Sequence, residues 1–153
     1  MMSAPARLMA KSCSIITASW SSQPFSAAAF IVSLSFDDSS GILVAEAGVL
    51  LDDIIKTFLP KGWFPYVTPG SKFVTVGGLI AADVHGKNHH KEGSFRNFVE
   101  WFEIINSKGK ILKCSKNENS DLFEWTMGGM GLTGIIIRAA IKLRPIKTSW
   151  IKQ

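Results

Sequence analysis

The sequence predicts an α+β domain in which a mixed or antiparallel sheet is flanked by short helices. Three features predict it: two pairs of extended segments joined by turn-forming residues, short helical patterns between the strands, and a long alternating strand near the C-terminus. Hairpins with interspersed helices, rather than regular strand–helix alternation, are typical of α+β domains. The 153 residues suit a single domain.

The first predicted hairpin joins residues 29–35 to residues 42–49 through the turn-forming residues 37–41. A helix over 50–59 follows, because its apolar residues are spaced to share one helical face. These residues are Leu51, Ile54, Ile55 and Phe58. Proline and glycine at 60 and 62 end the helix, and 63–67 reads as a short extended piece.

The second predicted hairpin joins residues 98–106 to 111–115. A short helix then runs from Asn119 or Ser120 to Met127. Residues 134–145 form the last strand, which alternates between an apolar and a basic face. The apolar face carries Ile135, Ile137, Ala139, Ile141 and Leu143, and the basic face Arg138, Lys142 and Arg144.

The N-terminal segment, residues 1–30, differs from the rest. It is rich in serine and alanine, and neither a glycine nor an acidic residue occurs before Asp37. We expect 1–30 to be irregular or aberrant and the folded domain to occupy 31–153. No apolar run approaches the 18 or so residues of a membrane-spanning helix, and we expect a cytoplasmic protein.

The net charge of +5 suits an anionic ligand, although ordinary solvated lysines explain it equally well. Nucleic acid is not an expected partner, because no basic stripe surrounds Trp101 or Trp125. Cys13 and Cys114 lie far apart without a CxxC pair, which supports neither a zinc site nor a disulfide scaffold.

The segment from Pro69 to Gly86 concentrates glycines, a threonine and a histidine. Gly77 and Gly78 are predicted to open a small-residue helix over 79–84. Free amides at a helix start, beside glycines, let an anion approach the backbone. The pattern therefore favours cofactor binding, and a tight turn with a packed helix is the alternative.

All three histidines fall in the string His85–His90. His85 and His89 are four residues apart, as two metal ligands on one helical face would be. Gly86 and Asn88 argue against a helix, and no nearby cysteine or acidic pair completes a ligand set, so no metal site is expected. The loop is either a polar lid over a ligand or a solvated basic loop. A third glycine-rich stretch, 128–134, passes close to something bulky or simply joins a helix to a strand.

These strings resemble the FAD-linked oxidases of the vanillyl-alcohol oxidase type, which have a PCMH-type FAD-binding domain. Within that superfamily the sequence is most similar to the branch of decaprenylphosphoryl-β-D-ribose oxidase and its relatives. The resemblance covers about residues 36–150. It is carried by VTVGG at 74–78, HGKNHH at 85–90 and GSF at 93–95, and continues through EAGV at 46–49, PG at 69–70, DLF at 121–123, GG at 128–129 and GLTGII at 131–136.

The resemblance implies mainly the second subdomain of such a domain, holding FAD without a covalent bond and largely through backbone amides. The positions that would contact FAD are Gly70, Thr75, Val76, Gly77, Gly78, His85, Gly86, Lys87, Asn88 and Ile136. His85, near the isoalloxazine and the substrate, is the catalytic candidate. The implied function is that of the FAD-binding portion of an oxidoreductase acting on a CH–OH group of a sugar.

Two departures from the family pattern bear on that function. Family members carry a glycine-rich pyrophosphate loop upstream, whereas this chain has no glycine before Gly41. Their substrate domain follows the flavin domain, beyond the length of this chain. We therefore expect a fragment that binds a sugar or polyprenyl-phosphate sugar substrate only if the missing domain is supplied. The alternative is a non-catalytic remnant or interaction module that no longer binds FAD.

Overall fold

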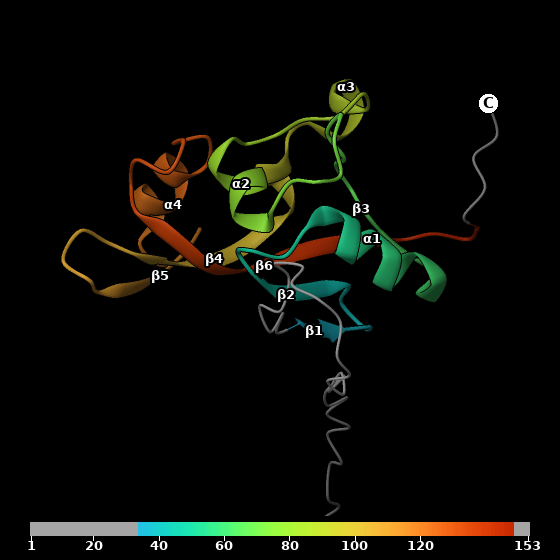
Figure 1. Ribbon diagram of the computed structural model, residues 1–153, viewed down its shortest axis with the longest axis horizontal. Helices are drawn as coiled ribbons and strands as arrows, with labels where there is room; N and C mark the ends of the chain where they lie inside the picture. Colours follow the sequence, from blue (N-terminus) through green and yellow to red (C-terminus); the bar gives the residue numbers. More distant parts are fainter. Residues whose placement is uncertain (1–33, 149–153) are drawn as a thin grey trace, which may run out of the picture.

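A computed structural model describes residues 34–148, and the expected irregular segment 1–30 lies outside them (Figure 1). Its strands form one sheet in the order β1-β2-β6-β4-β5, and β3 also pairs with β6. Every pairing is antiparallel, in agreement with the predicted α+β class. The strands are β1 Leu34–Asp37, β2 Ile42–Glu46, β3 Trp63–Pro65, β4 Val99–Ile105, β5 Ile111–Ser115 and β6 Ile135–Pro145.

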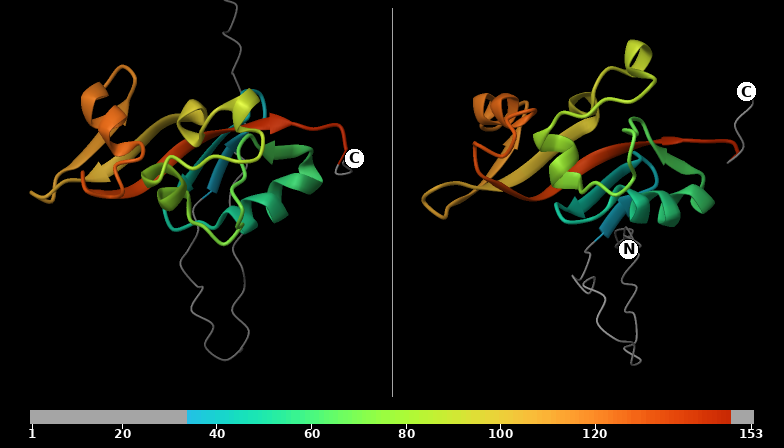
Figure 2. Two further views of the ribbon diagram at one scale, coloured as in Figure 1. Left: turned by 90° about the horizontal axis from the view of Figure 1, so that it is seen from above. Right: turned by 45° about the horizontal axis from the view of Figure 1, so that its top comes forward.

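Short helices cover one face of this sheet. In Figures 1 and 2, α2 and α4 lie over the same side of β4 and β6. Phe123 of α4 stacks on Phe102 of β4, with ring centroids 5.2 Å apart. Leu79 and Ile80 of α2 join the same buried cluster. The helices are α1 Leu51–Phe58, α2 Val76–Ala81, α3 His89–Glu92 and α4 Ser120–Thr126, with 3-10 turns at Leu59–Lys61 and Phe95–Phe98.

The opposite face of the sheet is polar. Arg138 of β6 donates to both carboxylate oxygens of Glu103 on β4, at 2.6 and 2.7 Å. This pairing lowers the pKa of Glu103 and raises that of Arg138. Lys142, two residues along, is exposed. Over residues 138–143 the predicted faces are confirmed, since Ala139, Ile141 and Leu143 belong to the buried core cluster and Arg138 and Lys142 are exposed. Ala140 is also buried but lies outside that cluster.

The alternation fails at the start of β6. In the pairing of β4 with β6, Glu103 lies opposite Arg138, but the next residue, Ile104, lies opposite Ile136. Ile137 therefore has no opposing residue. Such a bulge moves the following side chains to the other face. As a result Ile136 packs against the core, while Ile135, predicted to face inward, is 69% exposed.

Two helix predictions also need correction. The helix expected over 79–84 is α2, which begins at Val76, ahead of both glycines, because the Thr75 hydroxyl accepts from the NH of Gly78 at 3.1 Å. It ends at Ala81, and Asp83 follows with φ at +41°. The loop after His85, predicted to be non-helical, contains the single turn α3 from His89 to Glu92.

Candidate functional site

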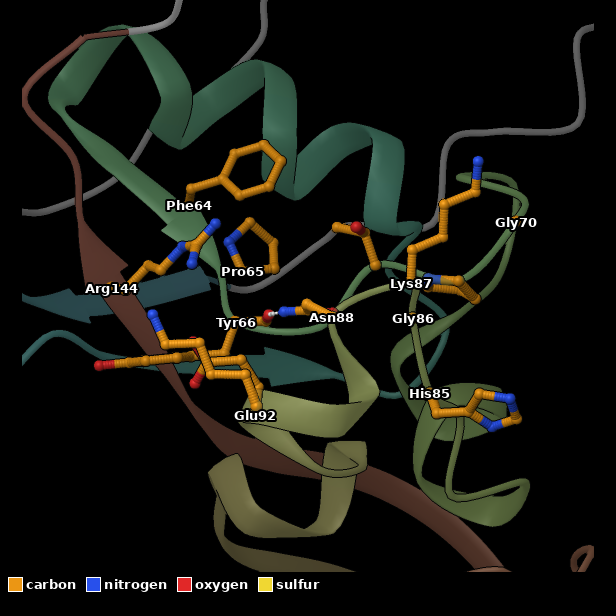
Figure 3. Close-up of a pocket in the computed structure, with 13 residues that line it drawn as sticks. Phe64, Pro65, Tyr66, Gly70, His85, Gly86, Lys87, Asn88, Glu92 and Arg144 are labelled. Carbon is orange, nitrogen blue, oxygen red and sulfur yellow. Dashed lines mark hydrogen bonds between the residues drawn. The ribbon is translucent and has the colours of Figure 1, made fainter. Parts of the chain in front are cut away.

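A hollow of about 970 Å³ lies between the loop that follows β3, residues 65–70, and the segment that follows α2, residues 85–92 (Figure 3). Arg144 of β6 contributes to its wall. This volume lies near the upper end of the range for small-molecule sites, roughly 300–1,000 Å³. Five of the predicted site residues line it, namely Gly70, His85, Gly86, Lys87 and Asn88.

Gly86 and Asn88 hold the two loops together. The side-chain amide of Asn88 donates to the carbonyl oxygen of Tyr66 at 2.9 Å, a bond drawn in Figure 3. A Cβ at Gly86 would lie 2.6 Å from the carbonyl oxygen of Thr68, so a side chain there requires the loops to separate. Tyr66 is held in turn by Phe98, whose ring stacks on it with centroids 4.1 Å apart. The two predicted residues therefore shape the pocket.

His85 lies at the rim of the pocket and is exposed. Its ring points away from Tyr66 and Arg144 in Figure 3. The ring of His89 is its neighbour, with centroids 5.1 Å apart. Among residues 34–148, no three His, Cys, Asp or Glu side chains gather as metal ligands would. His85 thus borders both pocket and solvent, where a ligand could reach it.

The other five predicted residues, Thr75 to Gly78 and Ile136, do not line this pocket. They belong to the start of α2 and to β6, where α2 rests on the sheet. Val76 is fully buried, and a Cβ at Gly77 would touch that of Ala47 at 3.0 Å. Gly78 is exposed.

The prediction that backbone amides in this segment are free to bind a dinucleotide is wrong at the start of α2. Val76 donates its NH to the carbonyl of Val49 at 2.9 Å, and Gly77 to that of Ala47 at 2.8 Å. The NH groups of Gly78 and Leu79 are both taken by Thr75, through its hydroxyl and its carbonyl. The cause is tertiary, since the chain between β2 and α1 runs alongside this segment and supplies acceptors. The hydroxyl proton of Thr75 remains for a ligand, whereas the NH and the carbonyl of Gly78 are already paired with Thr75 and Ala82.

Sequence reasoning missed Arg96, which connects several segments around α2. Its backbone NH and its Nε donate to the two oxygens of Asp83, at 2.9 and 2.6 Å. One terminal nitrogen donates to the carbonyl oxygen of Met127 at 2.9 Å. Asp83 lies two residues before His85, so this ion pair holds the chain just ahead of the pocket. A basic residue in an otherwise ordinary turn gave no signal of this role.

The third glycine-rich stretch, 128–134, is attached to the end of α2. Gly128 and Met130 donate their NH groups to the carbonyls of Ile80 and Ala81, at 3.1 and 2.8 Å. Thr133 is tied to Thr126 of α4 by a 2.8 Å contact between their hydroxyl oxygens. Of the two interpretations left open by the sequence, the structure supports both: the stretch joins α4 to β6, and its backbone approaches α2 closely.

Comparisons with known proteins identify the family. The FAD binding domain family matches residues 27–115, more than half of the chain. The chain belongs to the FAD-binding domain family. FAD is therefore its cofactor, and the PCMH-type resemblance found in the sequence is confirmed.

Several curated proteins are similar to this FAD-binding domain. Decaprenylphosphoryl-beta-D-ribose oxidase of Mycolicibacterium smegmatis is 44% identical over 117 residues, which cover 76% of this chain and 25% of that protein. Cytokinin dehydrogenase 5 of Arabidopsis thaliana is 34% identical over 69% of the chain and 20% of its own length. The human Delta(24)-sterol reductase is 30% identical over 74% and 22% respectively. The chain thus spans about a quarter or less of these relatives.

The residues present fit a flavin cofactor. Gly86 allows the backbone of the two loops to approach so closely that a Cβ would fill the gap, and the hollow beside it is large enough for a ring system. Lys87 extends alongside the Gly70 loop in Figure 3, where its ammonium can meet an anionic ligand. No helix among residues 34–148 has the length and apolar character needed to cross a bilayer.

Proposed function

We propose that the chain is the FAD-binding portion of an FAD-dependent oxidoreductase that acts on a CH–OH group of a sugar, of the decaprenylphosphoryl-ribose 2′-oxidase kind. The observation that carries the proposal is the loop His85–Asn88 at the edge of the pocket, in a chain 44% identical to an oxidase of that name. When bound, the flavin supplies the site that accepts a hydride. The protein binds and orients the reactants.

The other predicted site residues would have different roles in binding FAD. Gly70, with open space beside it, would let the ring approach the backbone, Gly86 lets the two loops close on each other, and Lys87 would offer a positive charge at the pocket wall. Thr75 would donate its hydroxyl proton to the phosphate-bearing part of the cofactor, and Gly78, which is exposed and has no side chain, would let that part approach. Val76, Gly77 and Ile136 act by packing α2 against the sheet.

His85 is the candidate catalytic residue, because its imidazole lines the pocket and histidine is the side chain that most often acts as a general base. When the carbon of a CH–OH group gives up its hydride, the hydroxyl oxygen must give up its proton as the carbonyl forms, and His85 would receive that proton. The substrate, a sugar or polyprenyl-phosphate sugar, would meet this rim when the substrate domain is supplied.

Titration of the purified chain with FAD, followed by flavin fluorescence, tests the proposal. We expect saturable, non-covalent binding that acid precipitation releases, and His85→Ala should alter the flavin spectrum or weaken binding several-fold. His90→Ala is the matched control, because His90 is also exposed but does not line the pocket. A chain that ignores FAD would favour the alternative, a non-catalytic remnant or interaction module. Equal effects of the two variants would remove His85 from the site.

A further inference from the structure

We propose that the pocket holds a second binding determinant, an anion subsite centred on Arg144 and Lys91 that binds a phosphoryl group. Both residues line the hollow, and neither is among the residues assigned to FAD. The subsite goes beyond the proposed redox function, because it concerns a phosphoryl group other than those of the cofactor.

The charges around the pocket are unbalanced. Its lining includes three cationic side chains, Lys87, Lys91 and Arg144, and a single acidic one, Glu92. Among the described residues, the ion pairs within 4.0 Å involve other cations, namely Lys56, Lys72, Arg96 and Arg138. The pocket therefore carries an excess positive charge that its own walls do not neutralise, and a concave site concentrates that field on an anion.

Arg144 is the member of this group with the most constrained position. It pairs directly with Phe64 across the β3–β6 ladder, and its Cζ lies 5.9 Å from the centroid of the Phe64 ring. The ring orients the guanidinium by a cation–π contact. Figure 3 shows the side chain reaching from β6 toward Pro65 at the pocket wall.

One nitrogen of the Arg144 guanidinium lacks an acceptor. Its Nε is buried and has no hydrogen-bond partner among residues 34–148. A buried donor without a partner is costly, particularly in a charged group. An anion at the pocket wall would instead offset the charge of this guanidinium, with which none of the described carboxylates pairs, whereas a neutral ligand would not.

A phosphoryl group suits this arrangement best. Its oxygens match the planar fork of arginine, and its double negative charge suits an arginine and a lysine together. The same group can arrive on a soluble phosphate compound or on a lipid headgroup.

Calorimetric titration of the FAD-loaded chain with inorganic pyrophosphate tests the subsite. Co-sedimentation with phosphatidic acid vesicles tests whether a lipid headgroup can supply the phosphoryl group, and phosphatidylcholine vesicles are the comparison. The key variant is Arg144→Gln. Its control is Lys142→Gln, which removes the same charge from an exposed position on the same strand outside the pocket. Arg144→Lys keeps the charge but loses the fork.

We expect Arg144→Gln to weaken binding at least about ten-fold, Arg144→Lys to weaken it less, and Lys142→Gln to change it less than two-fold. FAD affinity should stay within two-fold in all three variants, which separates this proposal from the redox proposal. Dependence on Arg144 with either phosphoryl source supports the subsite. It is overturned if the wild type binds neither source, if both glutamine variants weaken binding equally, or if Arg144→Gln weakens FAD instead.

Discussion

Replacing Gly86 by alanine perturbs the pocket at its narrowest point. The added Cβ would lie 2.6 Å from the carbonyl oxygen of Thr68 and 2.8 Å from Oδ1 of Asn88, where ordinary contacts begin at 3.4 Å. The loops must therefore separate by several tenths of an ångström, which strains the bond from Asn88 to Tyr66. Overpacking of this kind costs about 1–3 kcal/mol, and the lower entropy of the unfolded alanine chain offsets about 0.4–1 kcal/mol. With the middle of each range, the net loss of stability is about 1.3 kcal/mol.

Urea unfolding and a thermal melt measure this effect. We expect Gly86→Ala to lower the melting temperature by about 4–8 °C and to weaken FAD binding, because the hollow is distorted. Gly70→Ala is the control for stability: Gly70 belongs to the facing loop, but its added Cβ would meet no atom within 4 Å. That variant should match the wild type in stability to within about 0.5 kcal/mol. Equal stability of the two variants would refute the reasoning about the loop contact.

Three further predictions concern the framework around the pocket. Arg96→Gln removes the ion pair with Asp83 and the hydrogen bond to the carbonyl of Met127. Chemical unfolding should therefore show a free energy of unfolding lower by about 2 kcal/mol, a value that already allows for the partial exposure of the pair. A decrease below about 0.5 kcal/mol would contradict this role of Arg96. The pKa of Asp52 is lowered by hydrogen bonds to Lys56 and Lys72. The stabilisation that the ionised Asp52 provides is therefore complete above about pH 4 and is lost as the pH falls through the lowered pKa. In thermal melts, lowering the pH through this range should reduce the melting temperature of the wild type more than that of Asp52→Asn. Burial raises the pKa of the Cys114 thiol, and peptide mapping should find it alkylated at pH 8 only after unfolding.

Much of the architecture followed from local pattern. The second hairpin, the helix α1 and most of the long strand β6 were predictable, because turn residues and apolar spacing report directly on local backbone geometry. The first hairpin is present, but its first strand runs over Leu34–Asp37 and includes a residue predicted to lie in the turn, and residues 29–33 of the predicted strand lie outside the described residues. The errors lie where a distant segment intervenes. The bulge opposite Ile104 rotates the start of β6, and Thr75 starts α2 ahead of its glycines.

The candidate site, too, was predictable where the signal is local and not where it depends on distant segments. The string from His85 to Asn88 was found from the sequence, since its residue types are unusual wherever they lie. Arg144 was predicted only as a residue on the polar side of a strand, and its pairing with Phe64 depends on a ladder between segments about eighty positions apart.

The sequence by itself determined the family, the cofactor and the antiparallel α+β framework, because these follow from residue order, spacing and composition. Only the tertiary structure decided which predicted residues share a pocket and which backbone NH groups are available. The NH groups of Val76 and Gly77 donate to the carbonyl oxygens of Val49 and Ala47 and are therefore not available. The physical reason is that every buried NH must find an acceptor, and the acceptor it finds depends on which strand folds against it.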